Sequence, residues 1–101
     1  MKPLPVRFAE PAIDDMIALH LWVETRASIA VADDYQARLE EHCARLCDFP
    51  RRGSPRPELG EGIRSLTFER RISILYRVDD DQVSILRLMG AATDMSALSL
   101  Y

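Results

Sequence analysis

The sequence has 101 residues, enough for one domain that buries roughly 60 to 70% of the surface of its unfolded chain. With 48% hydrophobic and 29% charged residues, it is too apolar for a disordered chain and too charged for a membrane protein. No stretch approaches the roughly 20 apolar residues of a membrane span, and residues 1–7 lack the apolar core of a signal peptide. We therefore expect a single domain over residues 1–101, located in the cytoplasm.

The formal net charge of −3 conceals three segments of alternating sign. Residues 1–48 carry nine acidic and five basic residues, residues 49–78 carry three and seven, and residues 79–101 carry four and one. Nearly every cation is arginine, which forms planar bidentate contacts with carboxylates or phosphates. This pattern fits either a structured anionic partner or an ordinary surface whose arginines pair with acidic helices.

The first expected elements are a short strand and an amphipathic helix. The apolar run 4–8 ends just before Pro11, and proline suits the first turn of a helix. From Ala12 onwards apolar residues recur at helical spacing, so this segment is predicted to be a helix with one apolar face. We expect its larger apolar side chains to lie in the core, namely Met16, Leu19 and Trp22.

A second amphipathic helix is predicted after residues 25–28, with Ser28 as its N-cap. Its apolar stripe consists of Ala32, Tyr35, Leu39, Cys43 and Leu46. A connection this short joins antiparallel neighbours, so the two helices should form a hairpin with one continuous apolar side. Cys43 and Cys47 lie one turn apart, where a disulfide would constrain almost nothing, and we interpret them as reduced thiols.

The second half of the sequence predicts a loop followed by strands. Residues 49–57 contain three prolines and a glycine, which cannot continue a helix. In residues 71–78 the period becomes two, as in a strand with one buried face that includes Ile74 and Tyr76. Residues 83–89 form another strand after a turn at 79–82, and residues 63–68 a third, weaker one.

Strand, helix, helix and a three-stranded meander in this order predict an α+β domain. The antiparallel helical hairpin would pack on one face of a small, mainly antiparallel sheet, which leaves the other face open. Alternation favours one exposed face that carries arginines together with Leu75. Arg87 should reach a carboxylate or the surface, since an unpaired buried cation is costly.

Several motifs recur over about the whole chain in an order that resembles a known family. The most specific are Gly62-Ile63-Arg64, Ile74-Leu75-Tyr76-Arg77-Val78 and Ile85-Leu86-Arg87. They resemble the ParE/RelE superfamily of type II toxin–antitoxin toxins, especially its ParE branch of plasmid stabilisation proteins. The resemblance implies the RelE/ParE-like fold, a cognate antitoxin of the ribbon-helix-helix, ParD-like type that wraps the toxin, and DNA gyrase as the target.

Two activities divide this superfamily, because RelE-like members cleave mRNA in the ribosome whereas ParE-like members act on DNA gyrase. Cleavage requires groups that activate a ribose 2′-OH and stabilise the phosphate, which RelE-like toxins supply with Lys, Arg, His or Glu and a C-terminal Tyr. At the sheet positions that resemble these, the chain has Arg64, Leu66 and Ser73. Gly90 stands where many members have His, and Tyr101 is a weak substitute for a tail tyrosine.

The resemblance therefore favours a ParE-like gyrase inhibitor, which is not an enzyme and has no catalytic residue. A RelE-like ribosome-dependent mRNA endonuclease and a decayed, non-toxic antitoxin-binding module remain the alternatives. The candidate contact residues for the target or the antitoxin are Arg64, Arg71, Leu75, Arg77 and Arg87. The arginines can instead pair with glutamates nearby in the sequence, such as Glu58 or Glu69.

Other polar clusters carry less weight. His42 lies about 100° around the helix from Cys43, so these residues and Cys47 are not predicted to bind a metal, and no cofactor is expected. The basic loop 51–56 lacks the aromatic residues that stack on bases. Sequence-specific nucleic-acid binding is therefore not expected.

Overall fold

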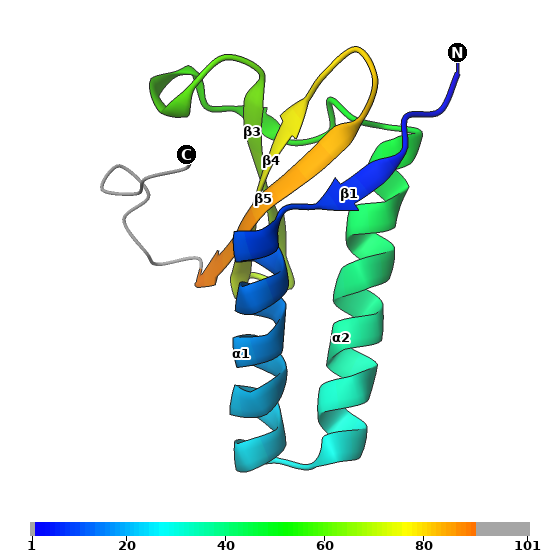
Figure 1. Ribbon diagram of the computed structural model, residues 1–101. Coiled ribbons are helices and arrows are strands. Elements are labelled where there is room, and N and C mark those ends of the chain that lie inside the picture. The colour runs from blue at the N-terminus through cyan, green and yellow to red at the C-terminus, as the bar shows by residue number, and fades with distance from the viewer. Residues whose placement is uncertain (1, 91–101) are drawn as a thin grey trace.

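A computed structural model describes residues 2–90, and the predictions for Tyr101 and for a domain boundary at residue 101 lie outside them. The main elements are β1 (Val6–Phe8), α1 (Glu10–Arg26), α2 (Ile29–Ala44), β2 (Ser54–Pro55), β3 (Ile63–Phe68), β4 (Ile72–Val78) and β5 (Val83–Gly90). Two short 3-10 helices, η1 (Arg45–Cys47) and η2 (Pro57–Leu59), lie between α2 and β3. Figure 1 shows α1 and α2 side by side, with their connection projecting beyond the sheet.

The two helices begin and end as local sequence dictates. Proline stands in the first turn of α1, where its missing N–H is not needed. Ser28 caps α2, as predicted, because its side chain accepts a hydrogen bond of 3.1 Å from the Val31 backbone N–H. No helix in the described part of the chain is long and apolar enough to cross a membrane.

The sheet has five strands in the order β1-β5-β4-β3-β2. Only the β1–β5 pair is parallel, so the prediction of a mainly antiparallel sheet ending in a meander is confirmed. The expected loop at 49–57 contains one unpredicted edge strand, β2, in which Pro55 pairs with Arg64. Proline is tolerated there because an edge strand needs no second ladder of hydrogen bonds.

The core lies between the helical hairpin and one face of the sheet. Most of the residues predicted for it are buried: Met16, Leu39, Leu46, Ile74 and Tyr76. Leu19 and Tyr35 are partly buried and pack against this cluster. The prediction for Trp22 is wrong, since its side chain is 50% exposed. Trp22 lies near the end of α1, where the hairpin extends past the sheet that would otherwise cover it.

The second sheet face does carry Leu75 together with Arg77 and Arg87, as predicted, but the prediction that Leu75 is exposed there is wrong. Leu75 is fully buried on the central strand β4, between Ser65 of β3 and Arg87 of β5. The register pairs Arg64 with Tyr76 but Arg77 with Ile63. Because successive residues of a strand face opposite sides, Arg64 and Arg77 lie on different faces of the sheet.

A bulge in β5 explains why the apolar pattern of this strand is irregular. Leu75 pairs with Arg87 whereas Tyr76 pairs with Ile85, which leaves Leu86 as the extra residue. The bulge lets both Ile85 and Leu88 join the core under the helices although they are three residues apart.

Candidate functional site

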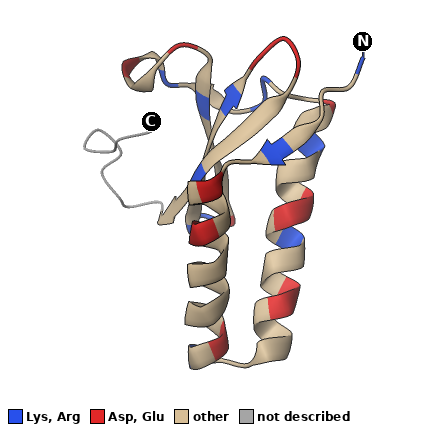
Figure 2. Cartoon of the chain, viewed as in Figure 1, with Lys and Arg blue, Asp and Glu red and all other residues tan. Residues whose placement is uncertain are grey.

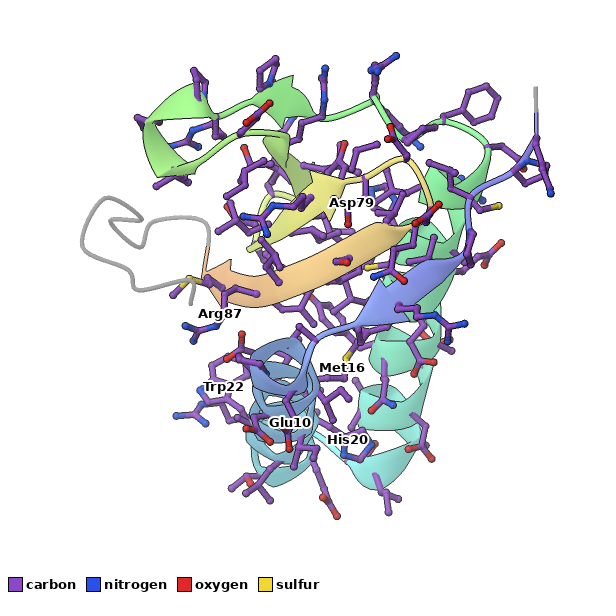
Figure 3. All side chains as sticks on the ribbon, turned by 45° about the horizontal axis from the view of Figure 1, so that its top comes forward. Glu10, Met16, His20, Trp22, Asp79 and Arg87 are labelled. Atoms are coloured by element: carbon purple, nitrogen blue, oxygen red, sulfur yellow. The ribbon has the colours of Figure 1, made fainter. Side chains whose placement is uncertain are left out.

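An apolar groove of about 600 Å³ lies where the end of α1 and the beginning of α2 meet the ends of two strands. We call it the Trp22 groove. It is lined by Ala18, Leu19, Trp22, Val23, Arg26, Ala27, Val31, Tyr35, Arg71, Ile72 and Gly90. Figure 3 shows Trp22 on the side of α1 that points away from α2.

The rim of the groove combines exposed apolar side chains with cations. Trp22 and Val31 remain 50% and 49% exposed. The guanidinium carbon of Arg26 lies 4.3 Å from the centroid of the Trp22 ring, a cation–π contact. Arg71 adds a second exposed cation, which forms no ion pair with any of residues 2–90. Half-exposed tryptophan beside arginine is typical of surfaces that bind other proteins.

Tyr35 closes the groove on the side of α2. Its ring packs edge-on against Phe68, with the centroids 5.6 Å apart, and the guanidinium carbon of Arg38 lies 5.2 Å from its centroid. Burial and then Glu69 raise the pKa of Tyr35, which Arg71 and Arg38 partly oppose. The phenol therefore stays protonated at neutral pH and can donate a hydrogen bond.

Asp15 joins α1 to the outer edge of β5. It accepts hydrogen bonds of 2.8 and 3.1 Å from the Arg87 side chain and one of 2.9 Å from the Leu88 backbone N–H. The hydrogen bond to Asp15 raises the pKa of Arg87. Since β1 covers β5 only as far as Ile85, this carboxylate supplies the acceptor that a neighbouring strand would otherwise provide. Figure 3 shows Arg87 beside the beginning of α1.

Residues 6–95 match the family described as the ParE toxin of the type II toxin–antitoxin system parDE. The chain belongs to this toxin family. A structure from the chromosomal ParDE system of P. aeruginosa has the same fold, with a TM-score of 0.77 at 23% identity over 89% of this chain and 98% of that chain. A structure from the RelBE2 toxin–antitoxin complex of Mycobacterium tuberculosis is similar at 30% identity, with a TM-score of 0.67 over 92% and 97% of the two chains. No curated protein matches the chain.

These matches confirm the predicted membership of the ParE/RelE superfamily, but the structure separates the candidate contact residues of the toxin. Only Arg71 lines the Trp22 groove. Arg64 binds backbone carbonyls, with Nη1 2.7 Å from the Gly53 oxygen, and Arg87 binds Asp15. Arg77 lies partly buried on the opposite face from Arg64, and Leu75 is inaccessible.

Two features of the toxin were missed at the level of sequence. One is the exposure of Trp22, which follows the apolar period of α1, so the sequence pattern alone does not distinguish it from a core residue. The other is the contact between the helices in which His20 Nε2 lies 2.8 Å from Asp33 Oδ1. No sequence pattern marks that pair, because its partners lie 13 residues apart across a turn.

The reactive side chains of the toxin lie in settings that suppress their chemistry. Burial raises the pKa of the Cys43 thiol to about 12, so it is not a thiolate at neutral pH. Burial, then Arg52 and Arg45, lower the pKa of His42, whose ring packs on Phe68 with centroids 5.2 Å apart. Within residues 2–90, no three His, Cys, Asp or Glu side chains come together as metal ligands would.

Proposed function

We propose that this toxin inhibits DNA gyrase by binding it, without chemistry of its own, and that an antitoxin neutralises the toxin from the Trp22 groove. The match to the ParE toxin family supports gyrase as the target. The two similar structures belong to ParDE and RelBE2 toxin–antitoxin systems, which supports an antitoxin partner.

The positions of the two histidines favour inhibition by binding over RNA cleavage. The chain has two histidines, and neither lies on the sheet. His20 pairs with Asp33 between the helices, and His42 packs on Phe68 with a lowered pKa. A nuclease needs a general base within reach of the ribose hydroxyl, and the cation expected to assist it, Arg64, already binds the carbonyls of the 51–53 segment.

The groove supplies the chemistry for an antitoxin segment. An amphipathic helix or extended segment can place apolar side chains against Trp22 and Val31. Carboxylates beside those side chains would meet Arg26 and Arg71 at the rim. A segment that is disordered until it binds suits such a surface, and the predicted ribbon-helix-helix domain of the antitoxin would then lie outside the groove.

Expression with and without the antitoxin, followed by assays of purified gyrase, tests the proposal. We expect the toxin alone to arrest growth, the product of the adjacent small gene to restore it, and the purified toxin to block supercoiling. New mRNA ends in primer extension, with supercoiling unchanged, would instead establish the endonuclease alternative. The 30% identity to the RelBE2 structure is the observation that favours this alternative. Antitoxin binding without any growth defect would establish the non-toxic module.

The antitoxin site has its own test in a matched pair of variants. Trp22→Ala should weaken antitoxin binding by roughly 30-fold, the cost of truncating an aromatic residue at the centre of an interface. Leu21→Ala is the control, because Leu21 is 60% exposed on the same turn of α1 but does not line the groove. Equal effects of the two substitutions would exclude the Trp22 groove as the antitoxin site.

A further inference from the structure

A second exposed surface lies at the far end of α2 from the Trp22 groove. Residues 48–52, which we call the Phe49 loop, line an open hollow of about 550 Å³. The Phe49 side chain is 67% exposed, the largest value among the exposed large hydrophobic residues of the described range 2–90. Along the helix axis, Val31 of the groove and Arg45 before the loop are separated by about 21 Å. One short segment bound in the groove therefore does not cover this loop.

Hydrogen bonds to the backbone of the Phe49 loop fix its conformation. The Phe49 N–H donates to the Arg45 carbonyl at 3.3 Å, and the Arg52 N–H donates to the Phe49 carbonyl at 3.2 Å. Arg64 of β3 donates to the Arg51 carbonyl at 3.2 Å. A partner that binds here has little loop entropy to remove, which favours affinity.

The loop ends at Gly53, which ties it to the core. The Gly53 N–H donates to the Tyr76 hydroxyl at 2.8 Å, and its carbonyl accepts from Arg64 at 2.7 Å. A Cβ at this position would lie 2.6 Å from the Tyr76 hydroxyl oxygen and 2.7 Å from the Ser65 carbonyl oxygen. Only glycine allows this close approach, so the backbone behind the exposed side chains is fixed.

The charge around Phe49 is mainly positive. Arg51 and Arg52 are exposed, and their side chains form no ion pair or hydrogen bond with any of residues 2–90. Arg45 nearby is occupied by Glu41, at 3.4 Å, and Asp48 is the one carboxylate in the lining of the hollow. Figure 2 shows further acidic residues along both helices and in two loops at the same end of the sheet as the Phe49 loop, but these residues do not line the hollow.

The composition of the surface favours a protein over a nucleic acid. A single exposed phenylalanine offers one face for stacking, whereas single-stranded nucleic acid is bound by several aromatic residues along a basic track. An aromatic side chain between arginines is, in contrast, a common centre of protein interfaces.

We propose that the Phe49 loop docks an acidic protein segment that carries an apolar side chain. The apolar side chain packs against Phe49 and Pro50, and flanking carboxylates bind Arg51 and Arg52. This inference rests on the proposed function in one respect: the target of the toxin supplies the segment. The antitoxin uses the Trp22 groove, so target binding and neutralisation are separable by mutation.

A peptide titration tests the docking surface without reference to the target. The probe is a short peptide of glutamate and aspartate around one leucine, added to the full chain freed from antitoxin, with amide shifts followed by NMR. We expect the shifts to concentrate on residues 48–52. The double variant Arg51→Glu, Arg52→Glu should weaken binding at least about tenfold, and Phe49→Ala about fivefold.

Two exposed residues provide matched controls for these variants. Ile29→Ala truncates an apolar side chain that is 60% exposed at the other end of α2, and Arg70→Glu reverses an exposed cation in the β3–β4 turn. Both should change peptide binding less than twofold, and all variants should keep the thermal stability of the parent because every altered side chain is exposed. Shifts located elsewhere, or equal losses in the controls, would overturn the proposal. A short DNA duplex that moves the same amides when the peptide does not would also overturn it, in favour of a nucleic acid.

Growth assays distinguish failure of this inference from failure of the proposed function. The Phe49 loop variants should lose growth inhibition and still co-purify with the antitoxin. If the peptide binds the loop but the variants stay toxic, the docking surface stands and its assignment to the target is overturned. If the unaltered toxin does not inhibit gyrase, the proposed function fails. The peptide titration then still determines whether the Phe49 loop is a docking surface.

Discussion

Replacing Asp15 with alanine removes three hydrogen bonds at once, two from Arg87 and one from the Leu88 backbone N–H. The side chains of Asp15 and Arg87 are only 18% and 25% exposed, so water replaces their contacts incompletely. Hydrogen bonds to charged groups contribute about 1.5 to 3 kcal/mol, and a partly buried N–H without an acceptor costs about 1 kcal/mol or more. We therefore expect Asp15→Ala to lower the free energy of unfolding by about 3 kcal/mol.

Because Asp15 also accepts from the Leu88 N–H, replacing Asp15 and replacing Arg87 should have unequal effects on stability. Arg87→Ala leaves Asp15 in place to accept from Leu88, so it should cost only about 1.5 kcal/mol, half of the loss in Asp15→Ala. Urea unfolding of the free toxin, followed by circular dichroism, measures both, and the double variant gives their coupling, expected near 1 kcal/mol. Asp14→Ala, one residue away and exposed, is the control and should change stability by less than about 0.5 kcal/mol. If Arg87→Ala costs as much as Asp15→Ala, the carboxylate does not serve as the acceptor at the edge of β5.

Three further predictions concern the core, the pH dependence and the surface. Gly53→Ala should destabilise the toxin by about 1 to 3 kcal/mol, because the added methyl group overpacks against Tyr76 and Ser65. Tyr76→Phe should destabilise it by about 1 to 2 kcal/mol, because the buried Gly53 N–H loses its acceptor. Thermal melts measure both effects. Burial holds the pKa of His42 below its ordinary 6.5, so the unfolded chain is protonated first as the pH falls. Stability should then decrease from about pH 6.5 downwards, and urea midpoints at several pH values should show a flatter profile for His42→Gln. Leu75→Ala should lower stability by about 2 to 5 kcal/mol, as for a core leucine, and leave the affinity of the folded toxin for the antitoxin unchanged. Trp22→Ala should instead weaken antitoxin binding and change stability little, because Trp22 is half exposed.

The helices and the meander were predictable because their signals are local. Periodicity located both helices and all three strands of the meander, and Ser28 identified the beginning of α2. The two-residue strand β2 was not predictable, since it exists only through its pairing with β3 and its sequence is that of a proline-rich loop. Periodicity also gave no warning of the bulge at Leu86, which is a property of two paired strands and not of one.

The candidate site was less predictable, because exposure depends on how far each element extends past its neighbour. Trp22 follows the apolar period of α1, yet the sheet ends before it can cover this turn. Leu75 follows the polar alternation of β4 but is buried, since β4 is the central strand. For the arginines, the sequence gave the charge and only the structure shows which partner each one has, a carboxylate for Arg87 and two carbonyls for Arg64.

The parallel pairing of β1 with β5 places residues 6–8 beside residues 83–85, near opposite ends of the described chain. During synthesis the helical hairpin is complete once Ala44 has been added, but β5 begins only at Val83. At about 5 to 20 residues per second, the ribosome needs roughly 2 to 8 s to cross this interval. Throughout that time the apolar side of the hairpin has no finished sheet to cover it, and β1 has no strand to pair with. Each new molecule of this toxin therefore exists first as a helical hairpin with an uncovered apolar side, and its Trp22 groove, which Gly90 helps to line, is complete only when the last strand has been added.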